Sequence, residues 1–106
     1  MDNVQQKLMN LLSMAARANK LMAGDFAVSK AIENNKIQLL LIACDTAEKS
    51  KKEYEKIALS AGVALKIIPI EKQLLGNNIG KTERAAIAIC DRGFAKAITK
   101  ILDDIS

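Results

Sequence analysis

The sequence contains no histidine and no tryptophan, and it has only one proline, one tyrosine and two phenylalanines. Without histidine the chain lacks the commonest general base and the commonest metal ligand. The scarcity of aromatic rings argues against a long platform on which successive bases of a single strand would stack. We therefore expect a protein that is not an enzyme, with no catalytic residue, no metal and no cofactor.

Long hydrophobic runs are also missing. The longest, LLLIAC at residues 39–44, is far shorter than the roughly 20 residues of a membrane span. The first ten residues lack the basic region and apolar block of a signal peptide. Cys44 and Cys90 each end an apolar run, which favours reduced, buried thiols over a disulfide. The sequence predicts a cytoplasmic protein without a membrane partner.

The residues that the chain does contain are largely aliphatic, and its net charge is mildly positive. Half of its 106 residues are hydrophobic, mostly Ile, Leu, Val and Ala. This length and composition predict one compact domain over residues 1–106. Sixteen Lys and Arg against twelve Asp and Glu give a net charge of +4, which permits a polyanionic partner such as RNA without requiring one.

Helical and extended patterns alternate along the chain. The periodicity and the turn residues predict helices that begin at Asn3 as a cap and end near 18–19, run from 24–25 to 34–35, run from Asp45 or Thr46 as a cap to Gly62, cover 71–76, and begin at Asp91 as a cap near the C-terminus. Extended segments are predicted at 20–23, 37–43, 63–70 and 84–90. This order predicts an α/β fold, a three-layer α/β/α sandwich around a small mixed sheet of about four strands.

The stretch LLGNNIGKTER, residues 74–84, looks at first like a phosphate-binding loop. Its two glycines are separated by three residues instead of four, and a predicted strand follows where a helix should open, so the nucleotide-binding pattern is not met. Two interpretations stay open. The stretch is a plain surface turn, or it is an RNA-contacting loop in which Lys81, Thr82 and Arg84 offer charge and a hydroxyl to phosphates while the glycines let the backbone approach the ligand.

Three segments in order carry a family resemblance: LMAGDFAVSKAIENNKIQLLLIACD, AGVALKIIPIEKQLLGNNIGK and AAIAICDRGFA. Together they resemble the ribosomal-protein superfamily that binds kink-turn RNA, and most of all its small bacterial branch of YlxQ type, over about residues 4–103. The resemblance implies an α/β/α sandwich and a single ribosomal-protein-like domain that binds structured RNA without catalysis. It also implies a role in translation, with ribosomal RNA among the candidate partners.

The resemblance further implies where the RNA is held. Members grip RNA with a lysine-containing strand, the N-terminus of the following helix and a loop before the last strand. In this sequence the corresponding RNA-binding residues are Lys20, Gly24, Asp25, Phe26, Lys30, Gly80, Lys81, Thr82 and Arg84. The helix that opens near Asp25 offers free N–H groups and a positive dipole end, and Asp25 itself is interpreted as the cap of that helix.

One departure from the family pattern concerns specificity. Archaeal and eukaryotic members carry an Asn-Glu pair that reads sheared G·A pairs, where this sequence has Phe26 and Ala27. Neither side chain can make those hydrogen bonds, so the residues predict recognition by phosphate and shape. Phe26 is either a core residue or a ring that stacks on an unpaired base. The same replacement leaves open a protein-interaction module that has lost RNA binding. In either case we expect a monomer.

Overall fold

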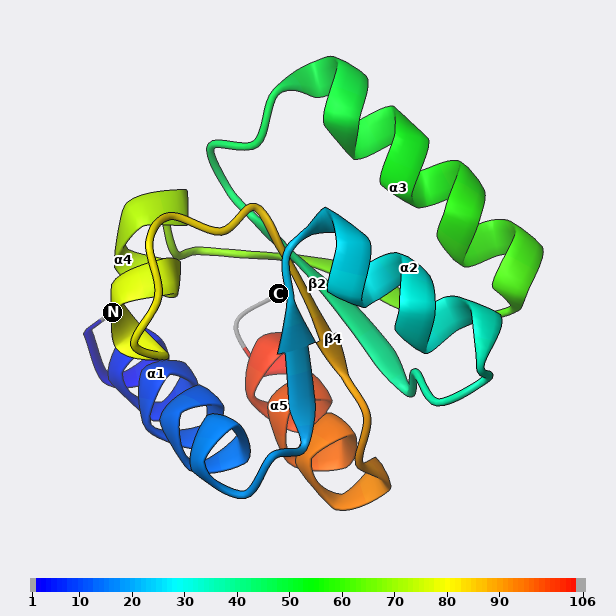
Figure 1. Cartoon of the computed structure of the whole chain (residues 1–106). Coiled ribbons are helices and arrows are strands. Elements are labelled where there is room, and N and C mark those ends of the chain that lie inside the picture. The colour runs from blue at the N-terminus through cyan, green and yellow to red at the C-terminus, as the bar shows by residue number, and fades with distance from the viewer. Residues whose placement is uncertain (1, 105–106) are drawn as a thin grey trace.

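The computed structural model describes residues 2–104 (Figure 1). In that range five helices and four strands follow one another: α1 (Asp2–Arg17), β1 (Leu21–Ala23), α2 (Asp25–Glu33), β2 (Leu39–Ala43), α3 (Glu48–Ala61), β3 (Leu65–Ile68), α4 (Lys72–Asn78), β4 (Ala86–Ile89) and α5 (Arg92–Asp103). No helix within residues 2–104 combines the length and the hydropathy needed to cross a membrane.

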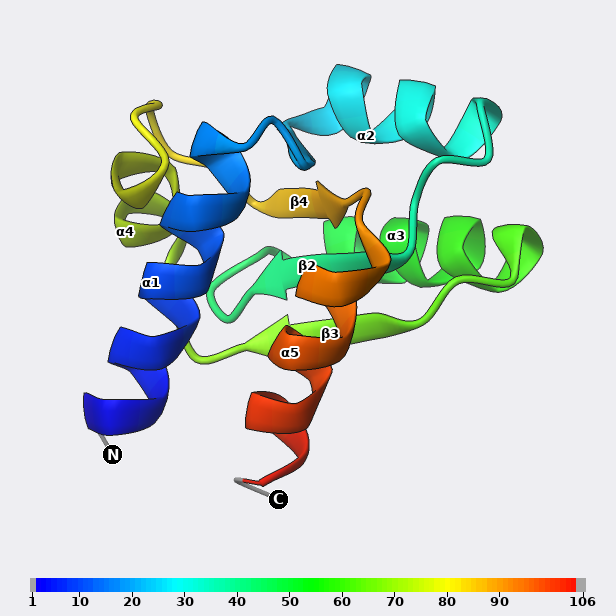
Figure 2. The same ribbon diagram turned by 90° about the horizontal axis from the view of Figure 1, so that it is seen from below.

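The four strands form one mixed sheet in the order β1-β4-β2-β3. Strands β2 and β3 are parallel, whereas β4 is antiparallel to both of its neighbours. Every residue of β2 is buried, as expected for a continuous apolar strand that is covered on both faces. Helices α2 and α3 cover one face, and α1, α4 and α5 cover the other (Figures 1 and 2). The predicted three-layer α/β/α sandwich with a four-stranded mixed sheet is therefore confirmed.

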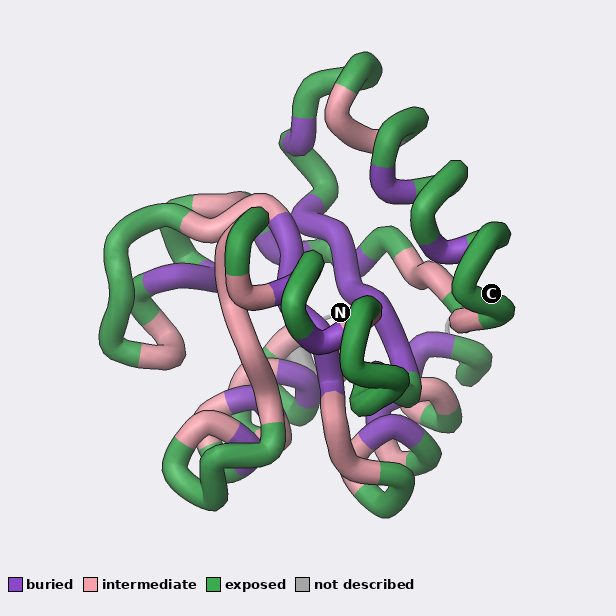
Figure 3. The backbone as a smooth tube through the Cα atoms, turned by 45° about the vertical axis from the view of Figure 1, so that its right-hand side comes forward, coloured by how far each residue is buried: buried purple, intermediate pink, exposed green. Residues whose placement is uncertain are grey.

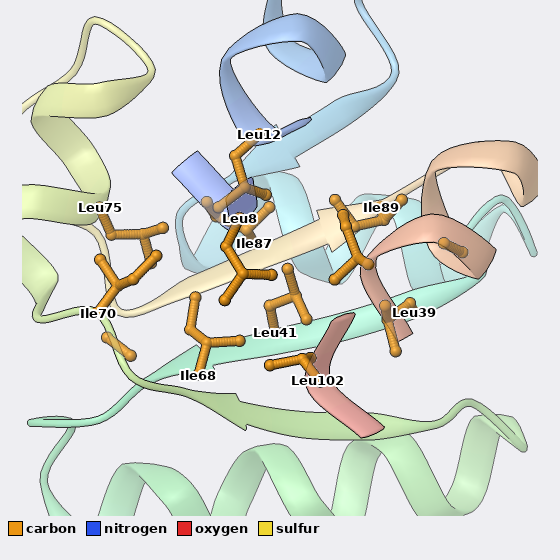
Figure 4. Packing of buried hydrophobic residues seen from close by; sticks show 13 residues of the cluster. Leu8, Leu12, Leu39, Leu41, Ile68, Ile70, Leu75, Ile87, Ile89 and Leu102 are labelled. Carbon is orange, nitrogen blue, oxygen red and sulfur yellow. The ribbon is translucent and has the colours of Figure 1, made fainter. Parts of the chain in front are cut away.

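The two faces of the sheet are packed with different side chains, because successive residues of a strand point to opposite sides. Leu39, Leu41, Ile87 and Ile89 meet the leucines and isoleucines of α1, α4 and α5 (Figure 4). The face toward α2 and α3 carries smaller groups, such as Ala86 and Ala88. Figure 3 shows buried residues running through the central strands and recurring on the helices. The larger core thus lies on the face of the sheet that is turned away from α2 and α3.

One of the predicted helix caps is confirmed, and another is wrong. Asp91 caps α5 as predicted, since its carboxylate accepts a hydrogen bond from the N–H of Phe94 at 2.9 Å. The cap predicted for α3 is wrong: the helix begins at Glu48 after Ala47, with no side-chain cap. Asp45 instead accepts from the N–H of Lys72 at 2.8 Å. α1 is already helical at Asp2, ahead of the predicted start at Asn3, whose side chain lies outside the described part.

The predicted ends of α3 and α2 agree with the structure. Gly62 ends α3 in the left-handed conformation, with φ of 68°, as predicted for a C-terminal glycine. Asn35, which follows α2, also has a positive φ of 55°.

Both cysteines are free, but Cys44 is exposed and Cys90 is only half-buried, so the prediction that both are buried is wrong. Burial raises the pKa of Cys90 above its usual value.

Candidate RNA interface

Strand β1 enters α2 through Gly24, whose φ of 97° and ψ of 159° are a conformation that side chains other than glycine rarely adopt. The N–H of Gly24 donates to the carbonyl of Ala86 at 3.2 Å, which ties this turn to the start of β4. Gly24 is also the residue before α2, and no side chain caps the helix there. The first N–H groups and the positive dipole end of α2 are therefore left open to a ligand.

Asp25 does not cap α2, so that interpretation is wrong. The helix begins one residue earlier than a cap at Asp25 requires, which makes Asp25 the first helical residue. Its carboxylate accepts a hydrogen bond from the hydroxyl of Tyr54, a buried side chain of α3. Burial and the hydrogen bond to Asp25 both raise the pKa of Tyr54 well above its usual value of about 10. The phenol thus stays a neutral donor and holds the carboxylate toward α3.

The loop after α4, residues 79–85, folds back along that helix and reaches the start of α2 (Figure 1). The N–H of Lys81 donates to the carbonyl of Gly76 at 2.8 Å, and the N–H of Arg84 donates to the carbonyl of Lys72 at 3.0 Å. The ammonium of Lys72 also lies 3.7 Å from the carboxylate of Glu83. These contacts fix the position of the loop. The loop carries several of the predicted RNA-binding residues.

The two glycines of this region have separate tasks. Gly76 is buried inside α4, and a Cβ there would lie 1.8 Å from the carbonyl oxygen of Thr82. Its small size lets the loop pack on the helix, so the interpretation that Gly76 lets backbone approach a ligand is wrong. Gly80 has a φ of 76° and open space around its Cα, which makes it the turn residue on the exposed side.

Arg84 connects the loop to the start of α2. Its Nη1 donates to the carbonyl of Thr82 at 3.2 Å, to the hydroxyl of Thr82 at 2.8 Å and to the carbonyl of Glu83 at 3.0 Å. Its stem lies against Gly24, where an added Cβ would be 3.5 Å from Nε. The remaining guanidinium nitrogens, Nε and Nη2, make no hydrogen bond with the described residues and can still donate to an anion.

Phe26, the second residue of α2, lies on the exposed side of that helix. Its side chain is 76% exposed, so the alternative that it belongs to the core is wrong. The ammonium of Lys30, one helical turn further on, lies 5.7 Å from the centroid of the ring, within the range of a cation–π contact. Residues 23–27 and 83–85 line a shallow hollow that brings Phe26 and Arg84 to the same place.

The other predicted residues are spread around this centre. Lys81 lines a second hollow beside β1, together with Asn19 and Ile79. Lys20 lies at the opposite end of β1, where its carbonyl accepts from the N–H of Cys90 at 2.8 Å. At the usual rise of a strand, Lys20 is about 13 Å from Gly24. The side chains of Lys20 and Lys81 make no ion pair with any residue in the range 4–104.

Two residues of this region, Tyr54 and Lys72, were not identified as functional from the sequence, and Gly76 was assigned the wrong role. Tyr54 is on the predicted inner stripe of α3, and the need of a buried hydroxyl for an acceptor was the available signal. Lys72 carried no such signal, because its contacts with the loop depend on the packing of α4. Among residues 2–104, no cluster of three or more His, Cys, Asp or Glu is placed to hold a metal ion.

Known proteins match the chain over most of its length. The ribosomal protein L7Ae/L30e/S12e/Gadd45 family matches residues 6–99. The RNA-binding protein YlxQ of Bacillus subtilis is 32% identical over 88% of this chain and 92% of its own. The RNA-binding protein YlxQ of Enterococcus faecium is 31% identical over 93% of this chain and 94% of its own.

Solved structures agree with these matches. A Bacillus halodurans protein of unknown function superposes with a TM-score of 0.84 at 33% identity, covering 92% of this chain and 97% of that one. A 15.5 kD RNA binding protein of Giardia lamblia superposes with a TM-score of 0.74 at 19% identity, covering 96% of this chain and 87% of that one, which shows a shared fold. The chain therefore belongs to the ribosomal protein L7Ae/L30e/S12e/Gadd45 family.

Proposed function

We propose that this chain is a non-catalytic RNA-binding protein that holds structured RNA at the start of α2 and on the loop 79–85. The observation that carries the proposal is the uncapped N-terminus of α2 beside the guanidinium of Arg84. Open backbone N–H groups, a positive dipole end and an adjacent cation are the groups that bind phosphate oxygens. Residues 1–106 act as one domain and as a monomer, and the two RNA-binding relatives support the choice of RNA.

The local charge supports the same ligand. Two carboxylates, Asp25 and Glu83, lie at the rim and would repel phosphate. Each has a protein partner, since Asp25 accepts from Tyr54 and Glu83 pairs with Lys72. The cations of Lys30, Lys81 and Arg84 have no carboxylate partner in the described residues. The surface thus offers an RNA backbone more positive than negative charge.

The specificity that we propose rests on phosphate and shape. Phe26 and Ala27 occupy the first turn of α2, and neither side chain has a donor or an acceptor for a base edge. A role in translation, with ribosomal RNA as the partner, agrees with the family to which the chain belongs. The kink-turn is the first RNA to test, because its sharply bent backbone offers a shape that phosphate contacts can distinguish.

The direct test is the salt dependence of RNA binding. Lys30→Ala and Arg84→Ala should each weaken binding and lower the slope of log Kd against log salt by about one, because each removes one phosphate contact. Lys96→Ala, an exposed lysine of α5 outside the proposed face, is the matched control and should leave the slope unchanged. Slopes that are equal in all four proteins would contradict the proposed face.

A pair of RNAs tests specificity in the same titration. One carries a kink-turn with tandem G·A pairs, and the other has Watson–Crick pairs at those positions. Salt-sensitive binding to both RNAs is expected from phosphate contacts, with the kink-turn preferred through its shape. Equal affinity would restrict the mechanism to phosphates alone. Absence of binding to either, together with a nuclease-insensitive protein partner, would support the interaction module instead.

A further inference from the structure

Phe26 is a large apolar ring that the fold itself does not use. Its side chain is 76% exposed, whereas the other phenylalanine, Phe94, packs against the larger core. Burying a phenylalanine ring is among the more stabilising events in folding, and Phe26 leaves most of that surface in water. The ring is therefore available to a ligand without any loss of packing in the protein.

The surroundings of the ring match a nucleotide better than an apolar protein surface. The neighbours of Phe26 on the exposed side of α2 are Asp25, Ser29 and Lys30, all of them exposed and polar. The hollow that Phe26 lines adds only alanines to this apolar surface, which stays far from the contiguous apolar area that a stable protein interface buries. A nucleobase, in contrast, needs one flat ring to stack on and a cation nearby for its phosphate.

Two cations lie near the ring. The ammonium of Lys30 lies 5.7 Å from the ring centroid, and Arg84 lines the same hollow as Phe26. The amide end of α2 is directly beside them, because Phe26 is the second residue of the helix. A base on the ring would place its own phosphate within reach of these groups, which joins the aromatic and the electrostatic contact in one nucleotide.

We propose that Phe26 stacks on an unpaired nucleobase of the bound RNA while Lys30 contacts the phosphate of that nucleotide. This inference rests on the proposed function and narrows its substrate class to structured RNA with an unpaired nucleotide, at a bulge or an internal loop, next to a paired segment. Stacking is tolerant of sequence, because every base has a flat face. The recognised feature is therefore an accessible base of any identity.

The test uses two RNA duplexes of one sequence, with and without a single bulged 2-aminopurine. The protein should bind the bulged duplex more tightly and quench its 2-aminopurine fluorescence. Phe26→Ala should lose about tenfold in affinity for the bulged duplex and most of the quenching, while affinity for the paired duplex stays the same. Phe26→Trp should retain both signals. Leu59→Ala, an 84% exposed side chain on α3, is the matched control and should change neither.

The outcomes separate the stacking inference from the proposed function. If Phe26→Ala binds and quenches like the unchanged chain while Arg84→Ala weakens both duplexes, stacking is wrong and the RNA-binding face stands. If Phe26→Leu retains full affinity and quenching, the ring acts only as apolar surface, which also overturns stacking. If the unchanged chain binds neither duplex at low salt, the stacking inference and the RNA-binding proposal fail together.

Discussion

The starts of α2 and α5 contain the same residue types, but these residues make different contacts in the two helices. Each helix follows a strand of the sheet, and each has an aspartate and a phenylalanine at its beginning. At α5, Asp91 is the residue before the helix, and its carboxylate accepts from the N–H of Phe94. Phe94 packs against the core. At α2 the residue before the helix is Gly24, and Phe26 lies in water.

A difference of one residue in the helix start separates the two cases. An aspartate before the first helical residue reaches back to the open N–H groups, whereas an aspartate at the first helical position points along the side of the helix. Asp91 therefore closes α5 and stabilises the fold. Asp25 is directed to Tyr54 instead, so that α2 stays open to an anion. The molecule has one helix start that serves stability and one that can serve binding.

The two phenylalanines give the largest expected contrast in stability. Phe94→Ala removes a ring that is partly buried against the core and should lower the free energy of unfolding by about 2 kcal/mol. Phe26→Ala removes an exposed ring and should change it by less than about 0.5 kcal/mol. Urea unfolding of the two variants beside the unchanged chain measures both values. A similar loss in both would mean that Phe26 packs on the protein in solution.

The two aspartates give the next contrast. Asp91→Ala deletes the cap of α5 and should lower the free energy of unfolding by about 1 kcal/mol, while Asp91→Asn keeps an acceptor and most of the stability. Asp25→Asn leaves α2 without a side-chain cap, as it already is, and should have a smaller effect. Thermal unfolding followed by circular dichroism ranks the three variants. A loss in Asp25→Asn as large as that in Asp91→Ala would mean that the negative charge of Asp25 stabilises the start of α2, because asparagine keeps the acceptor for Tyr54.

The sequence was sufficient for the architecture because the signals for it are local. The continuous apolar run at 37–43 predicted a strand buried on both faces, and β2 is buried throughout. Gly62 and Asp91 were identified as helix ends from their own conformational preferences. The alternation of helices and strands then led to the correct number of layers and of strands.

The site was less predictable, because its details depend on contacts between distant segments. Asp45 could not be distinguished from a cap until α4 placed the N–H of Lys72 beside it. Gly76 looked like a ligand-approach glycine, and only the folded loop reveals the carbonyl of Thr82 that leaves no room for a Cβ. The exposure of Phe26 follows from which face of α2 meets the sheet, and Val28 and Ala31 of that helix occupy the buried side.

The last and smallest contrast compares the chain with and without the hydroxyl of Tyr54, its one tyrosine, which holds the carboxylate of Asp25 away from the open start of α2. Tyr54→Phe removes one hydrogen bond to an exposed carboxylate and should lower the free energy of unfolding by about 0.5–1 kcal/mol. Because the pKa of Tyr54 is raised, this contribution is complete below about pH 10 and is lost as the pH rises toward the raised value. The difference between the two chains should therefore shrink above pH 10 in urea titrations, and a constant difference would contradict the hydrogen bond.

Tyr54→Phe should also connect stability to RNA binding, which a purely structural tyrosine would not do. Without the phenol, the carboxylate of Asp25 is free to turn toward the RNA phosphates, and affinity should fall about two- to threefold at low salt and recover at high salt. In an Asp25→Asn background no charge is left to release, so Tyr54→Phe should leave affinity unchanged. A loss of the same size in both backgrounds would mean that Tyr54 supports the shape of α2 and α3 only, and that the openness of the α2 start is independent of where Asp25 points.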